Sequence, residues 1–302
     1  MNVTMRNRAM RVWTWVVALL MMQGVTALSG DGVAAWAGDG VVRVLAIGNS
    51  FSMDAVEQNL WQIAAADGQQ MVIVNMYIGG CPIERHVNNI RADKADYRYC
   101  RIGVDGSRTV REGVSLASII DEEPWDYVSV QQASHDSGLP ATYALLPELV
   151  EWVRANAPTA EVVFHQTWAY AKTSTHSGFA NYGRDQMKMY AAIISTSRAE
   201  ARKAGIHTFI PTGTAVQNAR GTALGDDLTR DGFHLSYGIG RYIAAATWYE
   251  TLCHRSVVGN SYVPDGSEAG TAALTAEECR LAQKAVHKAV KRPFKVSKVK
   301  HG

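Results

Sequence analysis

Two short segments near opposite ends of the chain carry residue types used in nucleophilic catalysis. GNSFS occupies 48–52, and DGFH occupies 231–234, about 180 residues later. A serine hydroxyl becomes a good nucleophile only when a base removes its proton, and His234 is the candidate base for Ser50. Asp231 is close enough in sequence to orient the imidazole of His234, as in a Ser-His-Asp triad. Taken alone, the first segment is more typical of a capped turn, and the second also suits a tight turn.

The segments that must position these residues alternate between strand and helix patterns. Short apolar runs predict strands at 41–47, 71–76, 127–130, 161–164 and 208–210. Helical spacing predicts helices at about 54–66, 143–156, 180–204, 237–252 and 274–290. Nearly continuous apolar strands separated by helices indicate one α/β domain with a parallel sheet covered on both faces. Residues 92–125 break the alternation and predict a hairpin insertion.

Polar and glycine-rich segments follow the predicted strands, and ligands of such sheets bind beyond the carboxyl ends of the strands. GGC follows the second strand at 79–81, QQASH the third at 131–135, and HQTW the fourth at 165–168. The functional segments are therefore expected to meet at one edge of the sheet.

The order of these segments resembles that of the SGNH (GDSL-like) hydrolase superfamily. The best markers are GNSFS, GGC, WDYVSVQQ, FHQTWAY and RDGFHLSYGIGRY. The closest resemblance is to a bacterial branch known only as a domain of unknown function. It spans essentially all of residues 38–302. It implies a flavodoxin-like three-layer α/β/α sandwich with a parallel sheet. It also implies that Ser50 is the nucleophile, His234 the base and Asp231 the residue that orients the base.

The oxyanion of an ester reaction needs preorganised hydrogen-bond donors, and the backbone N–H groups of Ser50 and Gly80 are two candidates. Most of the superfamily adds an Asn from a G-x-N-D block, which is missing here, and Asn49 replaces the Asp of GDS. Aligning Ala133 with the family's Gly favours Gln132 as the third donor, because a related acetylesterase branch uses a Gln. The alternatives are Gln131 and His135.

Four residues that follow the fourth strand are candidates for substrate binding, because aromatic and amide groups suit a sugar ring. They are His165, Gln166, Trp168 and Tyr170. Packing in the core at the end of a strand explains them equally well.

Together these features predict a serine esterase that acts on small acyl esters, with O-acetyl groups on carbohydrate as the expected substrate. The chemistry requires no metal or organic cofactor. An acyltransferase would use the same residues, and a carbohydrate-binding relic of the fold is a non-catalytic alternative. The sequence sets neither the acyl length nor the oligomeric state.

Residues 1–37 have the pattern of a secretory signal peptide, which predicts a secreted or periplasmic protein. Arg6, Arg8 and Arg11 precede an apolar run, and Ala35-Trp36-Ala37 provides a small-residue cleavage site. The strictly apolar part is shorter than the ~20 residues that span a bilayer, so no stable membrane insertion is expected after cleavage. A domain over 38–302 would remain.

The charge balance argues against nucleic-acid binding. The whole chain has a formal charge of +2, and removal of 1–37 leaves 27 basic and 27 acidic residues. The local excess is a basic tail at about 291–302, and charge runs at chain ends are usually solvated and frayed.

Export would permit disulfides among the four cysteines. Proximity along the chain favours Cys81–Cys100 and Cys253–Cys279, although three pairings are possible.

Overall fold

The computed structural model describes residues 40–299, and the predicted signal peptide lies outside this range. The elements run in the order β1 (Val41–Gly48), α1 (Ser50–Val56), α2 (Leu60–Ala66), β2 (Gln70–Tyr77), α3 (Ile83–Arg91), β3 (Tyr97–Ile102), β4 (Arg108–Val114), β5 (Tyr127–Val130), η1 (Pro140–Tyr143), α4 (Leu146–Asn156), β6 (Glu161–His165), η2 (Ser177–Tyr182), α5 (Gln186–Lys203), β7 (Thr208–Ile210), α6 (Thr212–Arg220), α7 (Ile239–Cys253) and α8 (Ala276–Lys291). No helix within 40–299 has the length and apolar character needed to cross a membrane.

The strands form one sheet with the order β4-β3-β2-β1-β5-β6-β7. The strands β2, β1, β5, β6 and β7 pair in parallel. Their order is that of a flavodoxin-like sheet, in which the chain direction across the sheet reverses beside the first strand. β3 and β4 are antiparallel and extend the sheet beyond β2. The expected α/β class is therefore confirmed, with an antiparallel hairpin added at one edge of the parallel strands.

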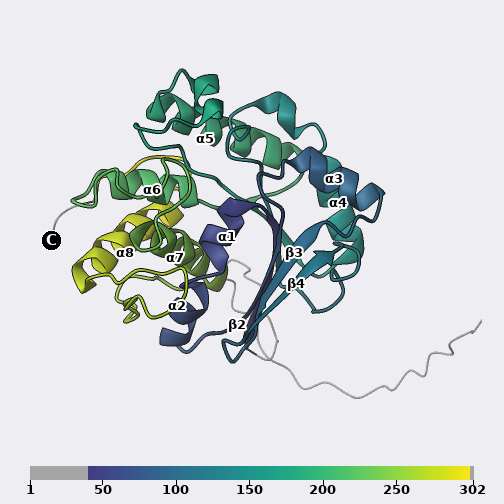
Figure 1. The fold of residues 1–302 in the computed structure, drawn as a ribbon, viewed down its shortest axis with the longest axis horizontal. Coiled ribbons are helices and arrows are strands. Elements are labelled where there is room, and N and C mark those ends of the chain that lie inside the picture. Colours follow the sequence, from purple (N-terminus) through teal and green to yellow (C-terminus); the bar gives the residue numbers. More distant parts are fainter. Residues whose placement is uncertain (1–39, 300–302) are drawn as a thin grey trace, which may run out of the picture. The chain divides into compact units, whose positions relative to one another are not determined.

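Helices cover both faces of the sheet (Figure 1). One apolar cluster joins the sheet to α1, α2, α6, α7 and α8, and a second joins it to α3 and α4. Successive side chains of β1 alternate between the clusters: Val44 and Ala46 belong to the first, Leu45 and Ile47 to the second. This alternation follows from the two-residue period of a strand, and it makes β1 a shared part of both cores.

The predicted helix at 54–66 is instead two helices, and its start was placed too late. α1 begins at Ser50 because the Asn49 side chain accepts a hydrogen bond from the Phe51 N–H at 3.0 Å, which caps the helix. Asn59 interrupts the helix with a φ of 63° before α2 begins. The short helices α3 and α6 were not predicted at all.

The segment after α8 is packed against the fold, contrary to the expectation of a frayed tail. The Thr214 hydroxyl donates to the Pro293 carbonyl at 2.7 Å, and the Ser297 N–H donates to Asn218 Oδ1 at 2.7 Å. The Phe294 ring packs edge-on against a second phenylalanine ring, with 4.9 Å between centroids. Residues 292–299 are thus a fixed part of the surface.

Candidate active site

Asn49 joins two of the segments that the sequence singled out. Its Nδ2 donates to the Cys81 carbonyl at 3.0 Å, while its Oδ1 caps α1. The GGC turn therefore lies beside Ser50 at the carboxyl ends of β1 and β2. Gly80 in that turn has a φ of +61°, a conformation that favours glycine.

Ser50, His234 and Asp231 form a continuous hydrogen-bonded chain, which we call the Ser50 cluster. The Ser50 Oγ lies 2.9 Å from His234 Nε2, and His234 Nδ1 lies 2.6 Å from Asp231 Oδ2. The serine and the carboxylate thus contact opposite nitrogens of one imidazole. This connectivity can carry a proton from the hydroxyl to the ring while the carboxylate stabilises the ring.

Asp231 is held in its ionised form. Burial by itself raises the pKa of this carboxyl. Hydrogen bonds from the His234 ring and from the backbone N–H groups of His234 and Phe233 outweigh that effect and bring the pKa below its usual value. An ionised carboxylate at this position favours the tautomer in which Nδ1 carries the proton and Nε2 faces Ser50.

Asp54 ties the helix that carries Ser50 to the loop that carries His234. Its carboxylate is 0% exposed and accepts from Arg230 at 3.0 Å and from Arg241 at 2.7 Å. It also accepts from the Leu235 N–H at 2.9 Å. Because breaking a buried ion pair leaves an uncompensated charge, Asp54 fixes the relative positions of the two segments.

A pocket of about 260 Å³ opens above the Ser50 cluster. The residues that line it are Asn49, Ser50, Tyr77, Gly79, Gly80, Ser134, His135, His176, Phe233 and His234. Within the described part of the chain, the backbone N–H groups of Ser50 and Gly80 have no internal acceptor. They are the two backbone donors that the sequence proposed for an oxyanion.

The structure does not support Gln132 as the third donor. Its Nε2 donates to the carbonyl and hydroxyl of Thr142, and its Oε1 accepts from the N–H groups of Ile83 and Ala133. The side chain is 0% exposed and bonds to these neighbours rather than lining the pocket.

The two alternatives for the third donor, Gln131 and His135, lie in different environments. Gln131 Nε2 donates to Asn49 Oδ1 at 2.8 Å, and its Oε1 lies 2.7 Å from His165 Nδ1. Both ends of this amide are therefore used within the protein, where Gln131 stabilises the cap of α1. His135 does line the pocket. Of the three candidates, His135 alone has its side chain in a position to meet a ligand.

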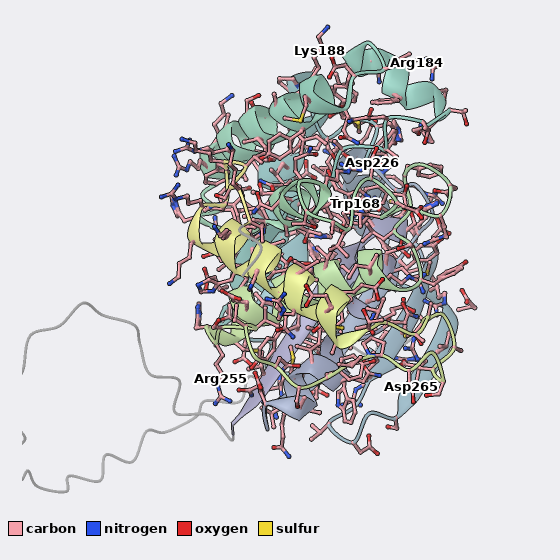
Figure 2. All side chains as sticks on the ribbon, turned by 90° about the vertical axis from the view of Figure 1, so that its left-hand side faces the viewer. Trp168, Arg184, Lys188, Asp226, Arg255 and Asp265 are labelled. Atoms are coloured by element: carbon pink, nitrogen blue, oxygen red, sulfur yellow. The ribbon has the colours of Figure 1, made fainter. Side chains whose placement is uncertain are left out.

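The four candidates for substrate binding belong to the core instead. His165, Gln166, Trp168 and Tyr170 are each 0% exposed. Trp168 stacks on Phe51 with 3.8 Å between centroids and lies among the packed side chains in Figure 2. Burial without a compensating charge lowers the pKa of His165 to about 3, so its imidazole is neutral. Packing by α7 and by the 231–234 loop covers these residues, which sequence periodicity could not reveal.

Sequence analysis missed four pocket residues: Tyr77, Ser134, His176 and Phe233. Phe233 had a signal, because it lies between Asp231 and His234. His176 precedes and caps the 3₁₀ element η2. Its Nδ1 accepts from the Gly178 N–H at 3.0 Å, so the neutral ring carries its proton on Nε2. Burial and the nearby imidazoles of His135 and His234 lower the pKa of His176.

The predicted cysteine pairings are not present. All four cysteines are free thiols, and Cys81 beside Gly80 is fully buried. Burial raises the pKa of Cys81 to about 12, so it is a packed neutral thiol rather than a nucleophile. Within residues 40–299, no group of three or more His, Cys, Asp or Glu side chains could hold a metal ion.

The fold and the site together define an α/β/α protein with a Ser-His-Asp hydrogen-bond chain at the carboxyl ends of its parallel strands. The family model described as "Domain of unknown function (DUF4886)" matches residues 43–289, and the chain belongs to this family. The match confirms the relationship to a bacterial domain of unknown function that the sequence motifs implied. No curated protein matches the chain.

Solved structures include a family member from Bacteroides uniformis that is 45% identical, with a TM-score of 0.82 over 86% of this chain and 98% of that chain. An acetyl xylan esterase, AlAXEase, is 15% identical, with a TM-score of 0.46 over 69% of this chain and 98% of that chain. A lipase/acylhydrolase from Enterococcus faecalis is 16% identical, with a TM-score of 0.44 over 69% of this chain and 94% of that chain.

Proposed function

We propose that the protein is a serine esterase that hydrolyses small acyl esters, with O-acetyl groups on carbohydrate as its substrate class. The Ser50 cluster is the observation that carries this proposal, because it joins nucleophile, base and carboxylate in one hydrogen-bonded chain, and Ser50 and His234 line one pocket. The signal-peptide pattern of residues 1–37 adds that the enzyme acts after export. Neither a nucleic acid nor a cofactor takes part.

In the first half of the reaction, the Ser50 Oγ attacks the ester carbonyl carbon while its proton moves to His234 Nε2. The tetrahedral intermediate then collapses, the bond to the alcohol oxygen breaks, and His234 returns the proton to the departing alcohol. Asp231 stabilises the imidazolium that exists between these two transfers.

In the second half, water attacks the acyl group on Ser50 and gives a proton to His234. The acid leaves when the bond to the Ser50 Oγ breaks and the oxygen recovers the proton. The protein ends in its starting state, and one water has been consumed for each ester cleaved.

The developing oxyanion is held by the N–H groups of Ser50 and Gly80. We assign the third donor to the His135 ring rather than to Gln132, because His135 lines the pocket and the Gln132 amide bonds to Thr142. Each preorganised donor of this kind contributes about 2.7–4 kcal/mol to transition-state stabilisation.

The pocket size supports a short acyl group. Its volume of about 260 Å³ lies below the ~300–1,000 Å³ typical of sites for drug-sized ligands. Three imidazoles and three hydroxyl groups in its wall suit the hydroxyls of a sugar better than a long alkyl chain.

The test is release of p-nitrophenol from esters of increasing acyl length and of acetate from an acetylated oligosaccharide. We expect the wild-type chain and Ser195→Ala, a control on the exposed face of α5, to turn over the acetate ester. We expect Ser50→Ala to fall to background and the rate to drop with acyl length. Equal rates for Ser50→Ala and Ser195→Ala would contradict the proposal. Release of acetate only when a sugar acceptor is present would instead favour acyl transfer.

A further inference from the structure

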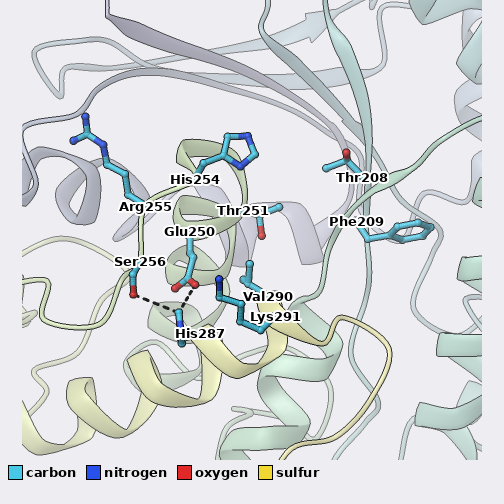
Figure 3. Close-up of a pocket in the computed structure, with 10 residues that line it drawn as sticks. All are labelled: Thr208, Phe209, Glu250, Thr251, His254, Arg255, Ser256, His287, Val290 and Lys291. Atoms are coloured by element: carbon cyan, nitrogen blue, oxygen red, sulfur yellow. Dashed lines mark hydrogen bonds and ion pairs between the residues drawn. The ribbon is translucent and has the colours of Figure 1, made fainter. Parts of the chain in front are cut away.

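A second hollow, of about 320 Å³, lies at the amino end of β7, whereas the Ser50 cluster lies at the opposite edge of the sheet, at the carboxyl ends of the parallel strands. Figure 3 shows the residues that line this hollow. Thr208 and Phe209 at the start of β7 form one wall, and the ends of α7 and α8 form the others. An adjoining hollow of about 340 Å³ shares His287 and Lys291 with it. We call the two together the basic groove.

The basic groove carries positive charge that the protein does not neutralise. Its permanent cations are Arg255, Lys288, Lys291, Arg292 and Lys298. Among the described residues, none of these five cations has an ion-pair partner. Such a concentration of free cations attracts an anionic ligand, and the recessed surface strengthens the local potential.

The carboxylate in the groove, Glu250, is already occupied. It is 5% exposed, lies 2.7 Å from His287 Nδ1 and accepts from the Val257 N–H at 3.0 Å. The Ser256 Oγ lies 3.3 Å from the same nitrogen of His287. Dashed lines in Figure 3 mark both contacts of this nitrogen. We call Ser256, His287 and Glu250 the His287 cluster. It orients the imidazole but leaves no carboxylate to neutralise the lysines.

The cations sit on a fixed surface rather than on a loose tail. Lys288 donates to the Lys298 carbonyl at 2.6 Å, which holds the last described residues against α8. The contacts of Pro293 and Ser297 with α6 anchor the same segment. A ligand therefore meets preorganised charges, which lowers the entropy lost on binding.

We propose that the basic groove binds an acidic polysaccharide that carries carboxylate groups. The hydroxyls of Thr208 and Ser256 line the first hollow and suit sugar hydroxyls. The aromatic ring in the described lining, Phe209, is 7% exposed, so the groove lacks the open stacking surface that single-stranded nucleic acids use. The choice of a polysaccharide among polyanions rests on the proposed function. An acidic polysaccharide that carries acetyl groups would bind the basic groove with its carboxylates and present its esters to the Ser50 cluster.

Binding at a second site would hold such a polymer near the Ser50 cluster and raise its effective concentration there. The groove itself takes no part in ester cleavage. Its loss is therefore expected to raise the KM for a polymeric substrate and to leave turnover of p-nitrophenyl acetate unchanged.

The test compares two triple variants of the full mature chain. One replaces Arg255, Lys291 and Arg292 in the groove by Ala. The control replaces the exposed Lys94, Lys172 and Lys188 by Ala, so that both lose the same charge. Figure 2 shows Lys188 on the side of the molecule opposite to Arg255.

The probe is polygalacturonate, measured by calorimetry at two salt concentrations beside uncharged dextran. We expect the groove variant to bind about tenfold more weakly and the control within about twofold of wild type. Wild-type binding should weaken as salt rises, because exposed charges are screened over ~8 Å at physiological ionic strength. Dextran should not bind.

Equal affinity of the two variants, or no binding of polygalacturonate by the wild type, would overturn the proposal. Binding of single-stranded DNA or phosphatidylserine vesicles as tightly as polygalacturonate, with the same loss in the groove variant, would overturn the polysaccharide assignment. A different result would contradict the proposed esterase activity alone: a wild-type chain that binds polygalacturonate but does not cleave p-nitrophenyl acetate.

Discussion

The Ser50 cluster and the His287 cluster contain the same residue types, a serine, an imidazole and a carboxylate, at opposite edges of one sheet. In the Ser50 cluster the serine and the carboxylate contact different ring nitrogens, at 2.9 and 2.6 Å. In the His287 cluster both contact Nδ1, at 3.3 and 2.7 Å. A ring bonded in the second way cannot take a proton from its serine through the far nitrogen. The connectivity through the imidazole, not the residue types, therefore separates a potential relay from a structural contact.

The groups that surround the two clusters also separate a potential catalytic site from a structural contact. Ser50 begins a capped helix and lines the same pocket as Gly80, whose N–H has no acceptor among the described residues and is available to a ligand. Ser256 accepts a hydrogen bond from the Val258 N–H and shares its hollow with Arg255 and Lys291. The first environment suits a transition state, and the second suits a bound anion.

The sharpest test of the comparison is removal of each serine. We expect Ser50→Ala to lower kcat/KM for p-nitrophenyl acetate by about 10⁴-fold or more. Ser256→Ala should stay within about twofold of wild type, because the His287 nitrogen that this hydroxyl contacts holds its proton toward the Glu250 carboxylate and so cannot accept one from the serine. A fluorophosphonate probe followed by peptide mass spectrometry should modify Ser50 and leave Ser256 free. Modification of Ser256, or an equal loss in both variants, would break the comparison.

Removal of each carboxylate is expected to have the next largest effect. Asp231→Asn should lower kcat by about 10³- to 10⁴-fold, because the amide favours the wrong tautomer of His234. Glu250→Gln should lower the free energy of unfolding but leave kcat unchanged. Rates at several pH values, with urea unfolding beside them, separate the two effects. If the kcat of Glu250→Gln falls by more than its fraction of folded protein does, the view that Glu250 has only a structural role would be contradicted.

A third test concerns the anchor of the Ser50 cluster, which is the buried Asp54 carboxylate with its ion pairs to Arg230 and Arg241. Asp54→Asn leaves Arg230 and Arg241 without their buried carboxylate, so the free energy of unfolding should fall by about 3–5 kcal/mol. At a temperature where the variant is folded, kcat should fall while KM changes little, since the base shifts relative to Ser50. The exposed Asp121→Asn is the control and should stay within about 0.5 kcal/mol. An Asp54→Asn protein with wild-type stability and kcat would show that the anchor is dispensable.

The smallest expected effect comes from His165, which lies beneath the Ser50 cluster and bonds to Gln131 and Thr212 rather than to a carboxylate. Its folded pKa of about 3 is below its unfolded value, so the unfolded chain binds a proton first as the pH falls. Stability is therefore lost between about pH 6.5 and 3, with about 3 kcal/mol lost by pH 4. Urea unfolding across this range should show a shallower slope for His165→Gln than for the exposed control His207→Gln. Parallel slopes would contradict this assignment.

Much of the framework of the fold was predictable because parallel strands buried on both faces are continuous apolar runs. The five parallel strands were found in this way, as was the meeting of segments at their carboxyl ends. The break between α1 and α2 was not, because it depends on the positive φ of Asn59 rather than on hydrophobic spacing.

The site was predictable to the level of segments and less so to the level of side chains. The sequence placed Ser50, Asp231 and His234 together, and the distances agree, while their catalytic roles stay a prediction. Gln131 and Gln132 are neighbours that bond to different parts of the fold, so composition could not say which amide faces a ligand. His176 reaches the pocket from a segment without any recognisable motif.

The carboxylate of Asp54 has a consequence for the order in which the protein is made. Its partners Arg230 and Arg241 are synthesised long after it, as are the residues of the base loop. A growing chain therefore carries an unsatisfied charge in α1, and Ser50 has no base until the last part of the chain has left the ribosome. Catalytic competence would then arise in one step, late in synthesis, and the nascent protein would be inert toward the esters it is proposed to cleave.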